Sequence, residues 1–122
     1  MKALTVRQPW ASLIAERRKR YETRSWLTHY RGLLAIHAGK NASEIPNDYI
    51  GQFPLGAIVA IAEIVQCHRA EDIRDYLSRE ELEVGDFSSG RFAWELRNVR
   101  PIVPPIPARG YQGLWEWTGD FP

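Results

Sequence analysis

Residues 56–67 constrain the fold of this chain more than any other stretch, because they form its most apolar run. The β-branched residues of this run and its length predict a central β-strand rather than a helix. Glu63 is the one charged residue in the run, and a carboxylate is costly to bury unless it is paired and hydrogen-bonded. We therefore expect Lys19 or Arg24 to pair with Glu63. The alternative is a position at a sheet edge, where Glu63 would face water.

Shorter strands and several helical segments are predicted around this central strand. The strands span residues 2–6, 21–26, 33–38, 91–99 and 113–118. The helical segments span residues 9–17, 45–50, 70–77 and 80–84, the last preceded by Ser78 with capping-box spacing. An extended connector before the last strand is predicted from Pro101, Pro104, Pro105 and Pro107. We therefore predict a single domain over residues 1–122 of α+β class, mainly β: a small β-barrel of five or six strands decorated by two or three short helices.

Charge is distributed unevenly along the chain. Residues 1–40 contain nine Lys and Arg and two Glu, a net charge of +7, so residues 41–122 carry −6 of the total of +1. Seven carboxylates and two arginines lie within residues 71–86, which we expect to form a solvated helical face. The split favours one basic face for an anionic partner and an acidic face opposite. In the alternative, the two halves interleave in space and their charges cancel.

Several classes of protein lack support in the sequence. No stretch approaches the ~20 apolar residues of a membrane span, and the N-terminus becomes charged too soon for a signal peptide. A single cysteine, Cys67, allows no internal disulfide and no cysteine zinc cluster, and the three histidines lack metal-ligand spacing. The chain contains no phosphate-binding loop or dinucleotide fingerprint. We expect a cytoplasmic protein with no metal, no cofactor and no membrane association.

Residues 19–24 carry the strongest functional pattern. Residues two apart in a strand share a face, so Glu22 and Arg24 should point the same way, with Lys19 above them from the preceding turn. A cation, a carboxylate and a second cation can hold a polar or anionic ligand while their own charges stay paired. The alternative is an ordinary exposed ion pair, which is worth little. The basic run at residues 16–20 suits a helix C-terminus and also a phosphate contact.

Aromatic residues accompany these cations. Rings that stack on bases and cations that neutralise phosphates are the components of sites for single-stranded nucleic acid. We expect most of the tryptophans in the core and Trp10, which follows Arg7 and Gln8 closely, in the site. His37 is expected to be a hydrogen-bonded histidine at a strand end.

Seven segments together form a pattern that covers nearly the whole chain. They are residues 3–11, 19–26, 30–32, 35–38, 54–59, 90–94 and 113–115. In these segments the chain resembles the ASCH (activating signal cointegrator homology) family of the PUA-like β-barrel superfamily. The family motif is G-x-K-x-x-E-x-R; Lys19, Glu22 and Arg24 fit it, and Arg17 stands where glycine is usual. The resemblance implies a barrel with a cleft near the motif and a role in binding RNA or another nucleic acid.

The leading hypothesis is a binding module for single-stranded RNA, another single-stranded nucleic acid or a modified nucleobase. The expected site combines motif residues, a wall and a basic rim for phosphate. The motif residues are Lys19, Glu22 and Arg24 with Glu63 beside them, the wall is Arg7, Gln8 and Trp10, and the rim is Arg17, Arg18 and Arg20.

The alternative hypothesis is a hydrolase acting on nucleosides or RNA. Some proteins of similar fold remove the acyl group from N4-acetylcytidine with a lysine, a threonine and a glutamate, and others are ribonucleases. The resemblance assigns Lys19 to the lysine and Glu63 to the glutamate, with Glu22 at the threonine position. Because Glu22 replaces the hydroxyl, water would be the nucleophile, Lys19 the base and Glu63 a proton shuttle. A third hypothesis is an interaction domain that docks a protein partner on the acidic residues 71–86.

Overall fold

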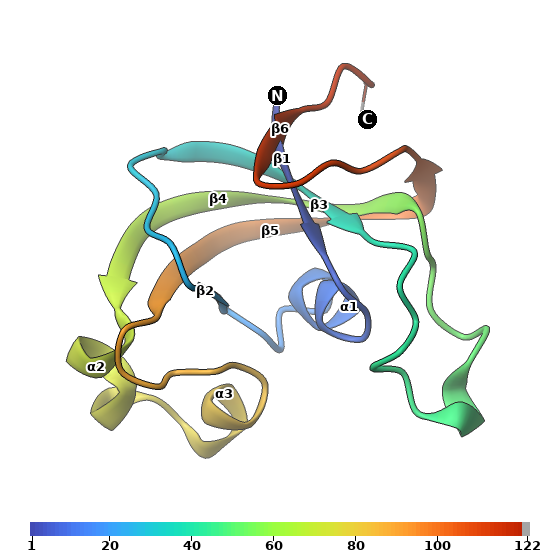
Figure 1. Cartoon of the computed structure of the whole chain (residues 1–122). Helices are drawn as coiled ribbons and strands as arrows, with labels where there is room; N and C mark the ends of the chain where they lie inside the picture. The colour runs from blue at the N-terminus through green and yellow to red at the C-terminus, as the bar shows by residue number, and fades with distance from the viewer. Residues whose placement is uncertain (121–122) are drawn as a thin grey trace.

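The apolar run forms β4 (Ala57–Arg69), the central strand of a six-stranded sheet in the computed structural model, which describes residues 1–120. β4 pairs antiparallel with β3 (Gly32–Ala38) on one side and with β5 (Phe92–Pro107) on the other. The residues from 57 to 62 are buried, so the prediction of a buried central strand is confirmed. β4 and β5 run side by side and bend together, which curls the sheet (Figure 1).

Three shorter strands complete the sheet, whose order is β2-β5-β4-β3-β1-β6. β1 (Lys2–Val6) runs parallel to β3, and β6 (Leu114–Glu116) pairs antiparallel with β1. β2 (Tyr21–Arg24) pairs antiparallel with the start of β5. Within residues 1–120 the edge strands β2 and β6 are not paired with each other, so the sheet is a curled half-barrel. The predicted mainly β, barrel-like class is confirmed.

α1 (Trp10–Ala15) lies in the concave side of the curled sheet (Figure 1). Its apolar positions Ala11 and Ile14 are fully buried and pack in one core cluster with residues such as Leu4 and Trp94. The burial of this helix fixes the direction in which the chain enters β2, which carries the motif residues. Among residues 1–120, no helix combines the length and the apolar composition that spanning a membrane would require.

The segment between β4 and β5 contains α2 (Ala70–Ile73), the 3₁₀ turn η2 (Arg74–Tyr76) and α3 (Arg79–Glu83). The Ser78 hydroxyl accepts the backbone N–H of Glu81 at 3.1 Å, the contact that the capping-box spacing predicts. The helix predicted over residues 45–50 is reduced to a 3₁₀ turn, η1 (Asn47–Tyr49).

The predicted proline-rich connector is instead the second half of β5, so this expectation was wrong. Ala60 of β4 pairs with Pro101, and Ala57 pairs with Pro107. β2 covers only residues 92–95 of β5, which leaves the outer side of residues 100–107 as an open edge. Proline lacks the N–H of a ladder bond and is therefore tolerated at such an edge.

Candidate nucleic-acid interface

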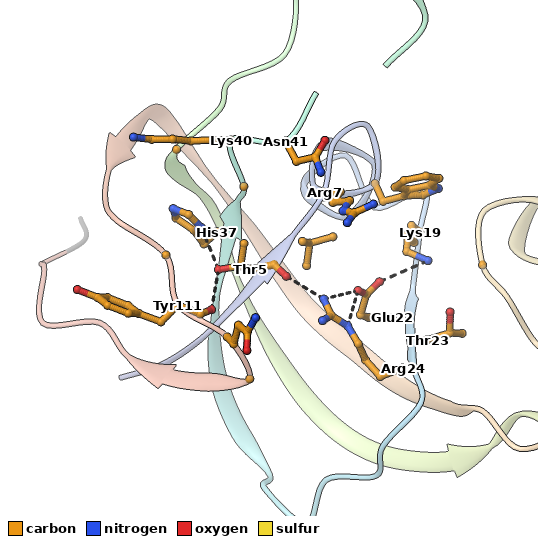
Figure 2. A pocket seen from close by; sticks show the side chains of 18 of the residues that line it. Thr5, Arg7, Lys19, Glu22, Thr23, Arg24, His37, Lys40, Asn41 and Tyr111 are labelled. Carbon is orange, nitrogen blue, oxygen red and sulfur yellow. Dashed lines mark hydrogen bonds and ion pairs between the residues drawn. The ribbon is translucent and has the colours of Figure 1, made fainter. Parts of the chain in front are cut away.

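A cleft of about 1700 Å³ opens at the carboxyl end of β1. β1, the start of α1 and β2 contribute to it, together with three connecting segments. These segments lie within residues 39–56, 83–91 and 107–113. Figure 2 shows Lys19 at one end of the cleft and Tyr111 at the other, with Thr5 between them.

Lys19 is 2% exposed and lines the cleft. Its Nζ donates to the carbonyl oxygen of Val84 at 2.6 Å and lies 3.7 Å from Oε1 of Glu22. Burial lowers the pKa of Lys19, because the charged amine loses its hydration, while the carboxylates of Glu22 and Glu81 act in the opposite direction. A buried amine of this kind beside a cleft is suited to binding a polar group or to accepting a proton.

Glu22 and Arg24 point the same way from β2, as their spacing predicts (Figure 2). Oε2 of Glu22 accepts a hydrogen bond from Nε of Arg24 at 3.0 Å and forms an ion pair with Nη2 of Arg24 at 2.8 Å. Nη2 of Arg24 also donates to the backbone oxygen of Thr5 at 2.8 Å. Glu22 is only 7% exposed, so its charge is compensated by partners rather than by water. The structure therefore brings Lys19, Glu22 and Arg24 into one cluster.

The turn before Lys19 keeps the geometry that glycine favours, although Arg17 occupies the motif's glycine position. Arg17 has φ of 63°, in the left-handed region. The N–H groups of Arg18 and Lys19 both donate to the oxygen of Leu13, at 2.9 and 3.1 Å, which closes the end of α1. The Arg17 side chain points away to the Val99 carbonyl oxygen, with Nη2 at 2.9 Å.

Glu63 does not join this cluster, so the expected pairing with Lys19 or Arg24 was wrong. Oε1 of Glu63 accepts from Nδ2 of Asn98 at 2.8 Å, and Glu63 does not line the cleft. The pairing of β4 with β5 shifts register between Ile61 and Glu63, and the side chain is half-buried where the strand leaves the core. A neutral amide and water satisfy a carboxylate at such a position, so no cation is required.

Gln8 has a structural role instead of the expected place in the cleft wall. It is fully buried; its Nε2 donates to Ser12 Oγ and to the oxygen of Pro54, and its Oε1 accepts from the N–H of Ser12, each at 2.9 Å. These bonds occupy the amide and anchor the start of α1 to the loop before β4. Arg7 and Trp10, the other predicted wall residues, do line the cleft.

The three arginines predicted to form a phosphate rim lie outside the cleft. Arg17, Arg18 and Arg20 do not line the cleft, and Nε of Arg18 is 3.5 Å from Oε1 of Glu80. The α1 C-terminus directs these side chains outward, which is the alternative that their position at a helix end suggested. The cations that line the cleft apart from the motif are Arg7, Lys40, Arg91 and Arg109.

The acidic segment is a wall of the cleft rather than only a solvated face. Oε1 of Glu81, 7% exposed, accepts the N–H of Arg20 at 2.9 Å, and burial raises the pKa of this carboxyl. Residues 83–86 line the cleft, and Val84 holds Lys19. Together with the Arg18–Glu80 pair, these contacts interleave the acidic and basic parts of the chain, as the alternative interpretation of the charge split proposed.

The opposite end of the cleft contains residues that spacing does not reveal. His37 is the hydrogen-bonded strand-end histidine expected from sequence: its Nδ1 is 3.1 Å from Thr5 Oγ1, and its Nε2 is 2.7 Å from the oxygen of Ala108. Arg109 and Tyr111 line the cleft next to it. Neither residue was among the predicted site residues, because both lie between the proline-rich stretch and the last predicted strand, away from the motif. The cation and the ring beside Gly110 were the available signal.

Comparison with known proteins supports the resemblance. The family model described as ASCH domain matches residues 4–106. Two relatives are activating signal cointegrator 1 of Mus musculus and that of Homo sapiens. Each is 28% identical to this chain over an alignment that covers 93% of the chain. The chain spans about a fifth of the length of these relatives, 22% in each case.

Solved structures agree in fold. The crystal structure of ASCH from Zymomonas mobilis has a TM-score of 0.64 at 15% identity, covering 96% of this chain and 87% of that one. A tyrosine-to-phenylalanine mutant of the same Zymomonas mobilis protein has a TM-score of 0.64 at 16% identity, covering 96% and 90%. The family model covers most of the chain, including the cluster of Lys19, Glu22 and Arg24. The chain therefore belongs to the ASCH domain family, whose domains generally bind RNA.

Proposed function

We propose that this ASCH domain binds single-stranded RNA, or a modified nucleobase within it, in the cleft above Lys19, Glu22 and Arg24. The observation that carries the proposal is a cation–carboxylate–cation cluster, with Lys19 and Glu22 buried and Arg24 partly exposed, in a cleft of about 1700 Å³. Single-stranded RNA is recognised through unstacked bases, which present hydrogen-bonding edges and aromatic faces.

The cleft offers groups for each part of a nucleotide. Oε1 of Glu22 is beyond hydrogen-bond distance of Lys19 Nζ at 3.7 Å, so it can accept from the exocyclic amine of a base. Lys19 Nζ has donors beyond the one used on Val84 and can bind a carbonyl or acyl oxygen. Trp10 and Trp26 line the same end and supply rings for stacking, and Arg7 supplies a cation for phosphate.

The test is fluorescence anisotropy with a short, labelled, mixed-sequence single-stranded RNA over salt concentrations from about 50 to 200 mM. The affinity should fall with salt, because bound phosphates displace counterions. Arg7→Ala should weaken binding and reduce the slope of log K against log salt by about 0.7, the value for one contact to a single strand. Arg79→Ala removes an exposed cation outside the cleft and should change neither quantity. Absence of binding at low salt would refute the proposal.

Hydrolysis of an acylated nucleoside is a second candidate function, favoured by the buried Lys19 and its lowered pKa. In this reaction Lys19 takes a proton from water and the hydroxide adds to the acyl carbon. The C–N bond then breaks as the protonated Lys19 gives that proton to the leaving N4, which yields acetic acid and cytidine. The second carboxylate of the site would be Glu22, because Glu63 lies elsewhere.

Incubation of the pure protein with N4-acetylcytidine tests this candidate. The rate should rise with pH through the lowered pKa of Lys19, since only the neutral amine accepts a proton. Lys19→Met should abolish turnover, and Arg79→Ala should leave it intact. No turnover would leave RNA binding as the sole candidate. Turnover that survives Lys19→Met would instead refute the role of Lys19 as the base.

A further inference from the structure

Residues 107–113 line the cleft at the end opposite Lys19. This segment, which we name the 107–113 loop, connects β5 to β6 and begins where the ASCH match ends at residue 106. Figure 2 shows its Tyr111 beside His37 and Thr5, across the cleft from Glu22 and Lys19. The family motif therefore accounts for one end of the cleft only.

Tyr111 and Arg109 form a stacked pair on this loop. The Arg109 guanidinium carbon lies 5.4 Å from the centre of the Tyr111 ring, and Tyr111 is 54% exposed. The ring also meets the edge of Trp115, with centroids 5.6 Å apart at 65°. A half-exposed ring next to a cation provides a stacking surface for a base and a charge for its phosphate.

A hydrogen-bond network holds this loop against β1 and β3. His37 Nε2 donates to the oxygen of Ala108 at 2.7 Å, and Thr5 Oγ1 lies 3.3 Å from the oxygen of Tyr111. Trp115 Nε1 donates to the same Thr5 oxygen at 3.1 Å. Burial lowers the pKa of His37, which favours the neutral ring. Because Nε2 donates to Ala108, Nδ1 is an acceptor, and it shares the single proton of the Thr5 hydroxyl with the oxygen of Tyr111.

Gly110 allows the loop to approach this network closely. A Cβ at residue 110 would lie 2.5 Å from His37 Cε1 and 2.6 Å from Thr5 Oγ1, so a side chain could not be added without moving both. The backbone of the loop therefore packs directly on His37 and Thr5, and the hydrogen bonds to Ala108 and Tyr111 hold it there. A platform ordered in advance loses less conformational entropy on binding than a mobile loop.

The size of the cleft exceeds what one small ligand needs. Pockets for single small molecules typically occupy about 300–1,000 Å³, whereas this cleft has about 1700 Å³. Its lining includes two groups of cations and rings at opposite ends, one around Lys19 and one on the 107–113 loop (Figure 2).

From these observations we infer that the 107–113 loop is a second nucleotide subsite, in which Tyr111 stacks on a base and Arg109 contacts the adjacent phosphate. The cleft then holds two or more consecutive nucleotides of one strand. This inference rests on the proposed RNA-binding function. It specifies in addition that the bound RNA is at least two nucleotides long and that its second nucleotide contacts the 107–113 loop.

The test compares a labelled tetranucleotide RNA with the corresponding mononucleotide by anisotropy and competition. Tyr111→Ala should weaken tetranucleotide binding roughly 5- to 150-fold, the effect of losing one stacked base, and leave mononucleotide binding unchanged. Tyr111→Phe keeps the ring and should bind like the wild type. Tyr76→Ala is the matched control, because Tyr76 is 87% exposed and lies outside the cleft.

Arg109→Ala provides an independent arm that keeps the Tyr111 ring and should reduce the salt slope by about 0.7. If Tyr111→Ala and Arg109→Ala both bind the tetranucleotide like Tyr76→Ala, the second subsite is refuted while RNA binding stands. Equal losses for the mononucleotide and the tetranucleotide would likewise refute it, because one nucleotide would then reach both ends. If the wild type binds no RNA, the proposed function fails and the subsite fails with it.

Discussion

At the residue scale, the site depends on a left-handed backbone position that an arginine occupies. A residue with a Cβ at φ of 63° carries a cost of roughly 1–2 kcal/mol that glycine avoids. Arg17 offsets part of this cost through its hydrogen bond to the Val99 oxygen, worth about 1 kcal/mol. This turn places Lys19 beside Glu22. The cluster therefore depends on a backbone conformation that is costly for arginine.

We therefore expect Arg17→Gly to be more stable than Arg17→Ala by about 1 kcal/mol, because both lose the hydrogen bond but only alanine keeps the strain. Urea unfolding followed by tryptophan fluorescence measures the difference. The same pair of substitutions at Arg18, which does not have positive φ, is the control. There alanine should be at least as stable as glycine. An alanine variant equal to or better than glycine at residue 17 would show that this backbone conformation is not strained.

At the scale of secondary structure, the features predicted correctly from the sequence are those set by residues close together in the chain. The apolar run gave β4, and the two-residue spacing of Glu22 and Arg24 gave their common face on β2. The continuation of β5 through its prolines could not be read locally, because proline is tolerated there only where β2 has ended. Whether a proline lies at an edge is a property of the assembled sheet.

The same distinction applies to the candidate site. Lys19, Glu22 and Arg24 are local and were predicted together, whereas the partner of Glu63 depends on the register shift between β4 and β5. The role of the acidic segment was missed, since packing of Glu81 on the backbone of Arg20 joins residues 61 positions apart. The 107–113 loop was missed for the same reason: its network reaches back to β1 and β3.

At the scale of the whole molecule, the curled sheet leaves β2 and β1 on separate parts of the half-barrel, with three strands between them in the order of the sheet. Arg24 spans this gap, because its Nε donates to Glu22 on β2 while its Nη2 donates to the Thr5 oxygen on β1 (Figure 2). The cleft lies around this bridge (Figure 2). The side chain that we place in the RNA site therefore also holds the two sides of the cleft at a fixed separation.

Arg24→Ala should consequently destabilise β2, on one side of the cleft, more than the core strand β4. The substitution removes charge-assisted hydrogen bonds worth about 1.5–3 kcal/mol and leaves Glu22 with Lys19 alone. Amide hydrogen exchange in β2 should accelerate roughly 10- to 100-fold, while exchange in β4 changes little. Arg97→Ala, which removes the half-exposed pair of Arg97 with Glu95, should affect neither strand measurably. Unchanged exchange in β2 would mean that pairing with β5 alone positions this strand, and that the Arg24 bridge serves the ligand rather than the fold.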